Sequence, residues 1–302
     1  MRTRPETPAA AGYETAEAGR PAVSIVIPAY NEENGIGPVL DELRRLDPTW
    51  EILVVDDGST DQTAAIAEGH GVRVIRHPFN RGYGASLKTG IMRARADRVV
   101  ITDADGTYPN ERIPELVAAL DENQMVVGAR TGGKVHIPWQ RRPAKWALAK
   151  LANYLSEARI PDLNSGLRAF YRDEVRDFFN ILPSGFSFTT TVTLAYHVND
   201  RFVLYIPIDY HRRAGSSKIR PIQDTLNFTA LILRTILYFR PLKIFLPLAL
   251  LLLLAAVGVF LYSWIWTERI MDASVSIILM TAIQMAAIGL LADLIDKRSG
   301  RA

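Results

Sequence analysis

Two long apolar stretches near the C-terminus constrain this chain more than any other feature. Between Leu242 and Trp266 the only charged residue is Lys243, and between Ala273 and Ala292 there is none. A helix needs roughly 20 apolar residues to cross the hydrocarbon core of a bilayer, and both stretches reach that length. One such stretch is also compatible with a buried core helix. Two in tandem, joined by the short segment TERIMD, predict a membrane hairpin.

Basic residues flank the predicted hairpin on both sides. They are Arg234, Arg240 and Lys243 before it, and Lys297, Arg298 and Arg301 after it. By the positive-inside rule both flanks lie in the cytoplasm, so we expect the bulk of the chain on that side.

Composition excludes several other classes of protein. The chain has no cysteine, which excludes disulfides and thiolate metal sites and fits a reducing compartment. Its 35 Lys and Arg residues are dispersed among 32 Asp and Glu residues, an arrangement that argues against a nucleic-acid partner. Residues 1–20 are rich in Ala, Pro, Glu and Thr and contain no apolar segment, so they predict a disordered tail rather than a signal peptide.

Short β-branched runs alternate with helix-like segments from Val23 to Val127. The predicted strands are 23–27, 51–57, 72–77, 98–105 and 125–130, and the predicted helices are 32–46, 61–68, 83–96 and 111–120. This alternation predicts an α/β fold with parallel strands, in which ligands bind beyond the carboxyl ends of the strands. Further along we expect helices near 144–157 and 189–199 and a strand at 202–210. Residues 222–239 have one polar and one apolar side, which predicts an amphipathic helix lying on the membrane or, alternatively, on the protein core.

Unusual polar motifs follow the predicted strands: PAYNE (28–32), DDGSTD (56–61), NRGYGASLKTG (80–90), DADG (103–106) and GAR (128–130). Asp103 and Asp105, at the end of a buried strand, can both reach one hard divalent cation, either Mg²⁺ or Mn²⁺. Such a pair alone is common in turns, and DDGSTD alone is compatible with a turn before a capped helix. Together, on one edge of a sheet, they predict a site for a metal and a diphosphate.

The motifs PAYNE, DDGSTD, NRGYGASLKTG, DADG, DLNSGLRAF and AGSSKI, in this order and followed by a hairpin, resemble one family. It is the family-2 inverting glycosyltransferases that load sugars onto polyprenyl phosphates, and the resemblance covers nearly the whole chain from Val23. It implies a GT-A fold, Rossmann-like with a mostly parallel sheet, in a multi-pass protein of the inner (cytoplasmic) membrane. The implied organisation is a tail at 1–20, the cytoplasmic GT-A domain at 21–215, a juxtamembrane amphipathic helix at 216–241, two transmembrane helices at 242–296, and a cytoplasmic tail at 297–302.

The resemblance implies a role for each of several residues on the donor side. Pro28, Tyr30, Glu32 and Asp57 are expected to contact the nucleotide, together with Asp103. Asp103 and Asp105 are expected to bind the metal that bridges the donor diphosphate, where a cation stabilises the departing charge. Members of this group that transfer mannose have a glutamine two positions after the second acid. Thr107 stands there instead, which leaves a third side-chain ligand open.

On the acceptor side the resemblance implies that Arg130 and Arg142 grip the lipid phosphate, because guanidinium groups pair bidentately with phosphate oxygens. With Asp105 they form the expected catalytic set. Asp162 and Asn164 are expected near the sugar, or else in a structural loop. Arg212 and Lys218 are expected to close over the donor diphosphate. For Arg142, Arg212 and Lys218 simple attraction to anionic lipid is the alternative.

One departure from related enzymes bears on the acceptor. Many glycosyltransferases of this fold place a carboxylate in the segment that corresponds to GFSFTTTVTL, where it deprotonates a hydroxyl. Here that segment offers Thr189, Thr190 and Thr191 and no acid. A lipid monophosphate is already an anion and needs no general base, so the missing acid favours a phosphate acceptor.

The implied function is inverting transfer of a hexose from a UDP- or GDP-sugar to a polyprenyl phosphate, undecaprenyl or dolichyl, with Mg²⁺ or Mn²⁺. One alternative is a hydroxyl acceptor, as in glycolipid or polysaccharide synthases, although the chain lacks a Gln-x-x-Arg-Trp signature. Another is a non-catalytic scaffold that binds nucleotide sugars. Gly258, Ala286 and Gly289 are expected to pack between protomers of a homo-oligomer, for which the resemblance suggests a tetramer.

Overall fold

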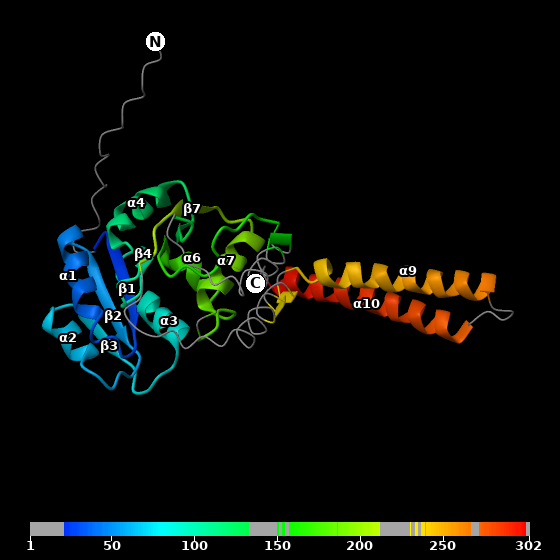
Figure 1. The fold of residues 1–302 in the computed structure, drawn as a ribbon, viewed down its shortest axis with the longest axis horizontal. Helices are drawn as coiled ribbons and strands as arrows, with labels where there is room; N and C mark the ends of the chain where they lie inside the picture. Colours follow the sequence, from blue (N-terminus) through cyan, green and yellow to red (C-terminus); the bar gives the residue numbers. More distant parts are fainter. Residues whose placement is uncertain are drawn as a thin grey trace, which may run out of the picture.

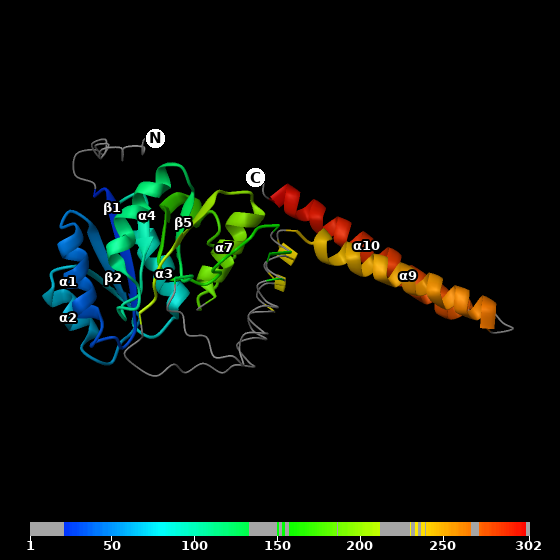
Figure 2. The same ribbon diagram turned by 45° about the horizontal axis from the view of Figure 1, so that its top comes forward.

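The structure is a computed structural model that describes residues 21–132, 150, 153–154, 157–185, 187–211, 230, 233–234, 237–238, 240–266 and 272–299. Its two parts are an α/β domain and a hairpin of two long helices, α9 (Leu242–Trp266) and α10 (Asp272–Ser299). In Figure 1 and Figure 2 these helices lie side by side and point away from the α/β domain. The limits expected for the N-terminal tail and the juxtamembrane helix stay predictions, because residues 1–20 and 212–229 lie outside the described part.

The α/β domain contains a seven-stranded sheet with the order β3-β2-β1-β4-β6-β5-β7. The strands are β1 (Val23–Ala29), β2 (Glu51–Asp56), β3 (Arg73–Arg76), β4 (Arg98–Ile101), β5 (Met125–Ala129), β6 (Arg168–Tyr171) and β7 (Val203–Pro207). Neighbouring strands are parallel except at β6, which runs antiparallel to both β4 and β5. The six predicted strands are therefore confirmed within a few residues.

Strand β6 was not predicted. It overlaps the end of DLNSGLRAF, where Asp162 and Asn164 were expected near the sugar or in a structural loop. The strand lies in the middle of the sheet, with Ala169 opposite Val100 of β4 and Val126 of β5. The strand has four residues and begins with an arginine, so it carries no recognisable apolar run. Its insertion brings the segment that precedes it to the carboxyl end of β4.

The helices of the domain follow the predicted pattern. They are α1 (Ile36–Leu46), α2 (Thr63–Gly69), α3 (Tyr83–Arg93), α4 (Ile113–Ala118), α6 (Arg172–Arg176) and α7 (Phe188–Val198), with short 3₁₀ helices at Asn110–Arg112 and Ala119–Asp121. The first helix starts later than expected, at Ile36, because residues 31–35 form a turn in which the Glu32 carbonyl accepts bonds from the Gly35 and Ile36 N–H groups. The helices predicted at 144–157 and 222–239 lie mostly outside the described residues.

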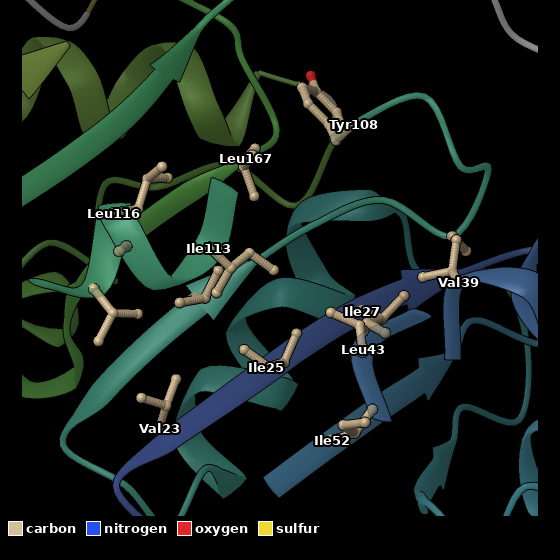
Figure 3. Packing of buried hydrophobic residues seen from close by; sticks show 14 of the residues in the cluster. Val23, Ile25, Ile27, Val39, Leu43, Ile52, Tyr108, Ile113, Leu116 and Leu167 are labelled. Carbon is tan, nitrogen blue, oxygen red and sulfur yellow. The ribbon is translucent and has the colours of Figure 1, made fainter. Parts of the chain in front are cut away.

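The sheet is covered by helices on both faces. On one face α1, α2 and α4 pack on residues such as Ile25 and Ile27 of β1. On the other face α3 and α7 pack on residues such as Val26 and Leu53. Figure 3 shows the first of these clusters, with Tyr108 at its margin and its hydroxyl directed away from the other labelled side chains. This margin is the carboxyl end of the central strands.

Small residues form the contact between α9 and α10. On α9 the buried residues are Ala249, Ala256 and Ser263, one at every seventh position, which is the spacing of a coiled-coil seam. A Cβ added to Gly289 of α10 would lie 2.6 Å from Cβ of Phe245 on α9. Gly289 was expected to pack between protomers, but it packs inside its own hairpin. The two helices are long and apolar enough to cross a membrane, with mean hydropathies of 2.9 and 2.2.

Candidate functional site

The loop after β1 is fastened to the loop after β2. The side-chain oxygen of Asn31 accepts a hydrogen bond from the Thr60 N–H (2.8 Å), and the Glu32 N–H donates to Oγ1 of Thr63 (2.8 Å). Asn31 has a positive φ of 54°, which turns the chain here. Tyr30, just before the turn, leaves 46% of its surface exposed. PAYNE and DDGSTD therefore lie together at the carboxyl ends of β1 and β2, as their place after adjacent strands predicted.

Asp57 is buried behind this edge and anchors the start of α3. Its Oδ1 lies 2.6 Å from Nδ1 of His77 and accepts from the Arg81 N–H (3.0 Å), and its Oδ2 accepts from the Gly82 N–H (2.8 Å). Gly82 has a φ of 99°, which other residues rarely adopt, so this close turn requires glycine. The carboxylate thus holds three internal partners, and its expected contact with the nucleotide stays a prediction.

Asp103 follows β4 and is oriented by a partly buried tyrosine. The Tyr83 hydroxyl, on the first turn of α3, donates to Oδ1 of Asp103 (2.9 Å). Burial and the nearby charge of Asp103 raise the pKa of Tyr83, which keeps its hydroxyl protonated as a donor. A Cβ on Gly166 would lie 2.9 Å from Oδ2 of the same carboxylate, so only glycine fits there without displacing Asp103.

Asp105 is oriented by its neighbour two residues on. Both the N–H (3.1 Å) and the hydroxyl (2.6 Å) of Thr107 donate to Oδ1 of Asp105. Thr107 is fully buried, so it supports the carboxylate from behind. Thr107 therefore orients Asp105, and a third side-chain ligand for the metal stays open.

Asp103 and Asp105 fit a hard divalent cation by the chemistry of their donors. Both offer carboxylate oxygens, which Mg²⁺ and Mn²⁺ prefer. Among the described residues no group of three or more His, Cys, Asp and Glu side chains gathers at one place. A cation here would thus have two protein carboxylates and would complete its shell with water and substrate oxygens, as Mg²⁺ commonly does.

Arg130, at the end of β5, is held by Asp162 and Asn164. Its Nε (2.8 Å) and Nη2 (2.9 Å) donate to the two oxygens of Asp162, and Nη2 also donates to Oδ1 of Asn164 (2.6 Å). Burial opposes the charge of Arg130, but its hydrogen bonds to Asp162 outweigh that effect and raise the pKa of the guanidinium. The same bonds lower the pKa of Asp162 although burial alone would raise it. Nη1 makes no hydrogen bond to any described residue.

The segment 162–166 joins the carboxylate side of the site to the arginine side. Asp162 holds Arg130, Ser165 donates to the Gly128 carbonyl (2.5 Å), and the Gly166 N–H donates to the Tyr108 hydroxyl (2.6 Å). Tyr108 immediately follows the DADG turn and Thr107. The sequence interpretation gave Asp162 and Asn164 a sugar contact and Arg130 a separate phosphate contact. The structure brings all three into one cluster next to Asp103.

Arg168, the first residue of β6, fixes the shape of this segment from below. It is fully buried, and its guanidinium donates to the carbonyls of Leu163 (3.1 Å) and Ser165 (2.7 Å) and to Oγ1 of Thr193 on α7 (2.6 Å). Burial lowers the pKa of Arg168. Sequence analysis missed this residue, as it missed Tyr83 and Tyr108. All three lie in or beside the quoted motifs, and that position was the available signal.

Two protein-family models match this chain. The model described as glycosyl transferase family 2 matches residues 24–179, and the model described as the GtrB C-terminal hairpin matches residues 240–297. This chain belongs to glycosyl transferase family 2. The α/β domain with its mostly parallel sheet is the expected GT-A fold, and the two-helix hairpin follows it, so the predicted fold class and family are confirmed.

Two curated relatives of this family-2 glycosyltransferase are named as transferases that act on polyprenyl phosphates. It is 33% identical over 201 residues to a dolichyl-phosphate hexose transferase of Haloferax volcanii, covering 66% of this chain and 87% of that protein. It is 31% identical to an undecaprenyl-phosphate mannosyltransferase of Micrococcus luteus, covering 65% and 87%. Among solved structures, glucosyl-3-phosphoglycerate synthase from Mycobacterium tuberculosis, in complex with Mn²⁺, UDP and phosphoglyceric acid, matches with a TM-score of 0.56 at 25% identity, covering 72% of this chain and 79% of that one.

Three residues expected in the glycosyltransferase site, Arg142, Arg212 and Lys218, lie outside the described residues, and their roles stay predictions.

The structure describes the threonines of the GFSFTTTVTL segment. Thr189, Thr190 and Thr191 lie in the first turn of α7 and are 1–3% exposed. Their hydroxyls are therefore part of the protein interior rather than of an open acceptor site.

Proposed function

We propose that this glycosyltransferase moves a hexose from a nucleotide diphosphate sugar, carrying UDP or GDP, to the phosphate of a polyprenyl phosphate, with inversion at the anomeric carbon. The observation that carries the proposal is the cluster in which segment 162–166 contacts both Arg130 and Asp103. It supports an anion site beside a metal and diphosphate site, in a domain joined to an apolar hairpin. The names of the curated relatives support the same acceptor class.

The donor side is proposed to bind the nucleotide against Pro28, Tyr30 and Glu32. Asp103 and Asp105, with their orientation set by Tyr83 and Thr107, would hold Mg²⁺ or Mn²⁺. A bound cation supplies charge stabilisation for the departing diphosphate. The solved relative whose complex contains Mn²⁺ and UDP supports this assignment.

The acceptor side is proposed to place a lipid phosphate against Nη1 of Arg130, which makes no hydrogen bond to a described residue. Asp162 and Asn164 hold the other edge, so the guanidinium is oriented before the acceptor arrives. A phosphate oxygen attacks the anomeric carbon, the bond from that carbon to the donor diphosphate breaks, and the nucleoside diphosphate leaves with the bonding electrons. The products are a sugar phosphoryl-polyprenol and a nucleoside diphosphate.

This reaction requires no general base at the position where hydroxyl-acceptor enzymes have a carboxylate. In the described part of that segment the available side chains are buried threonines. The attacking oxygen is already anionic at neutral pH, so no proton has to be removed from it. The buried threonines therefore support a phosphate acceptor over a hydroxyl acceptor.

The location of the enzyme follows from the same proposal. The hairpin would span the inner membrane and hold the catalytic domain at its cytoplasmic face, where basic residues precede α9 and follow α10. Assembly into a homo-oligomer stays a prediction.

The test is sugar transfer by purified full-length protein in detergent. UDP- and GDP-linked radiolabelled hexoses are supplied with undecaprenyl phosphate, with Mn²⁺ or with EDTA. The expected product is an organic-extractable, mild-acid-labile labelled lipid that requires the metal. Asp105→Asn should reduce its formation by about 100-fold or more, the scale expected for loss of an electrostatic contribution to catalysis.

The matched control is Asp121→Asn, which removes an exposed carboxylate paired with Arg98 at the opposite end of β4. It should retain wild-type transfer. If no donor labels the lipid and the labelled hexose is found on a sugar hydroxyl instead, the proposed acceptor is wrong. If donor binds without any transfer, the scaffold alternative holds instead.

A further inference from the structure

A cluster of charged residues joins the catalytic domain to the start of the hairpin. Nη1 of Arg240 lies 2.8 Å from Oε2 of Glu157, and Nη2 lies 3.3 Å from Oδ1 of Asp200. Nζ of Lys243, on the first turn of α9, lies 2.6 Å from the other oxygen of Glu157. We call these residues, Arg240, Lys243, Glu157 and Asp200, the junction clamp.

The backbone at the two acids is unusual. Glu157 and Asp200 have φ values of 57° and 55°, and they are two of the three non-glycine residues with positive φ in the described part of the chain. Residues other than glycine rarely adopt this conformation, and it persists where surrounding contacts enforce it. At Asp200 the positive φ ends α7, where the N–H groups of Asp200 and Arg201 donate to the carbonyls of His197 and Tyr196.

Arg240 also binds the end of α7. Its Nη2 donates to the carbonyl of Val198, the last residue of that helix, at 2.9 Å. A cation is favoured at a helix C-terminus, where carbonyl groups lack partners within the helix. In the first turn of α9, Ile244 packs against Ile160 and Leu194. The clamp thus combines charged contacts with a small apolar contact.

The elements held by the clamp are also those that shape the acceptor side of the site. Glu157 begins the segment that continues through Ile160 to Asp162, which binds Arg130. Helix α7 carries Thr193, which accepts a bond from Arg168 beneath the same segment. The first residues of α9 therefore contact the two elements that support the arginine site.

We propose that the junction clamp sets the orientation of the catalytic domain on its membrane helices, so that Arg130 faces the phosphate of a lipid embedded in the bilayer. Arg240, Glu157 and Asp200 are positioning residues for the lipid acceptor. This inference rests on the proposed function, because it assumes a polyprenyl phosphate acceptor.

The exposure of the clamp makes it testable without unfolding the domain. Glu157 and Asp200 side chains are 63% and 87% exposed, and exposed ion pairs contribute little to stability. The Asp162–Arg130 contact and the Arg168 contacts lie within the domain and do not involve Arg240. Loss of the clamp should therefore leave the site intact and change only its placement relative to the membrane.

The experiment compares two acceptors for the full-length protein in vesicles of phosphatidylethanolamine and phosphatidylglycerol. One acceptor is undecaprenyl phosphate in the bilayer, and the other is citronellyl phosphate, which is short and water-soluble. Arg240→Gln should raise KM for the bilayer acceptor by about fivefold or more, which is the scale of a lost cluster of exposed ion pairs. KM for the soluble acceptor, KM for the nucleotide sugar and the kcat for the soluble acceptor should stay within about twofold of wild type.

Three further variants sharpen the result. Asp200→Asn removes the charge but keeps a residue that tolerates positive φ, and it should act in the same direction. Glu157→Gln and Arg240→Gln both remove the ion pair between these two residues. The effect of the double variant on KM should therefore be smaller than the sum of the two single effects. Arg176→Gln is the matched control, since it removes an exposed ion pair with Asp173 away from the junction.

Equal losses with both acceptors, or no change with the bilayer acceptor, would overturn the proposal. A control variant with the same selective loss would overturn it too. These results are distinct from failure of the proposed function, in which wild-type protein transfers sugar to neither prenyl phosphate.

Discussion

At the scale of single residues, the site depends on groups that orient the functional side chains rather than on the functional side chains alone. The hydroxyls of Tyr83 and Thr107 each donate a hydrogen bond to an aspartate oxygen. Asp162 accepts hydrogen bonds from two nitrogens of Arg130. Gly166 contributes by having no side chain, because a Cβ would meet the Asp103 carboxylate. Orientation of this kind removes conformational freedom from a site before the substrate binds.

Gly166→Ala tests the close approach to Asp103. The added methyl would lie 2.9 and 3.1 Å from the two carboxylate oxygens and should displace them, which lowers transfer by about tenfold or more, as expected for a residue that supports a metal ligand. Gly185→Ala is the matched control, because its Cβ would meet no atom within 4 Å. Transfer rates at several Mn²⁺ concentrations, with Tm as a check of folding, measure the effect. Equal activity of the two variants contradicts the prediction.

The pair of Asp162 and Arg130 predicts a defined pH dependence of stability. Pairing lowers the pKa of Asp162 in the folded protein below its ordinary value of 3.8. The pair therefore stabilises the fold fully above that value, and the stabilisation is lost as the pH falls through the lower, folded-state pKa. Asp162→Asn should destabilise the protein by about 3 kcal/mol at pH 7, since it removes the charged partner of a largely buried arginine.

Thermal unfolding followed by tryptophan fluorescence measures this dependence. The difference in Tm between wild type and Asp162→Asn should be constant from about pH 7 to 5 and should narrow below about pH 4. If the difference in Tm already narrows above pH 5, the lowered pKa does not belong to Asp162 and the prediction is wrong.

At the scale of elements, the sequence predicted those parts that follow from local pattern. The alternation of β-branched runs and helical segments placed six strands and the helices between them, and it placed PAYNE, DDGSTD and DADG on one edge. Strand β6 escaped because Arg168, a charged residue, opens a four-residue strand in the centre of the sheet. The pairing of Arg130 with Asp162 was not predicted from the sequence for a related reason. It depends on β6 lying between β4 and β5, which is a long-range property of strand order.

The hairpin offers a prediction at the same scale. Gly289→Ala places a Cβ 2.6 Å from Cβ of Phe245, so the helices must move apart, and overpacking of this kind costs about 1–3 kcal/mol. Gly258→Ala, on α9, meets nothing within 4 Å of its added Cβ and should leave stability unchanged. Tm of the full-length protein in detergent measures both variants. A larger loss for Gly258→Ala would indicate that the exposed side of α9 forms the more important contact.

At the scale of the whole molecule, the proposed orientation is testable because the chain contains no cysteine. Single cysteines are introduced by Arg176→Cys in the catalytic domain and by Asp272→Cys at the first residue of α10, and membrane vesicles of known orientation are treated with an impermeant maleimide. The cysteine introduced by Arg176→Cys should be labelled only from the cytoplasmic side, and the cysteine introduced by Asp272→Cys only from the other side. Labelling of both from one side would contradict a hairpin that crosses the bilayer.

The small residues along the seam of the hairpin have a consequence for the fate of the product. Ala249, Ala256 and Ser263 allow α9 and α10 to touch over their length, so in the described part of the hairpin the space between the helices is closed. A sugar attached to phosphate is strongly hydrated and cannot pass through hydrocarbon or through such a closed seam. We expect the finished glycolipid to stay in the leaflet where it was made, open to periodate added on that side alone, until a separate transporter moves its headgroup across.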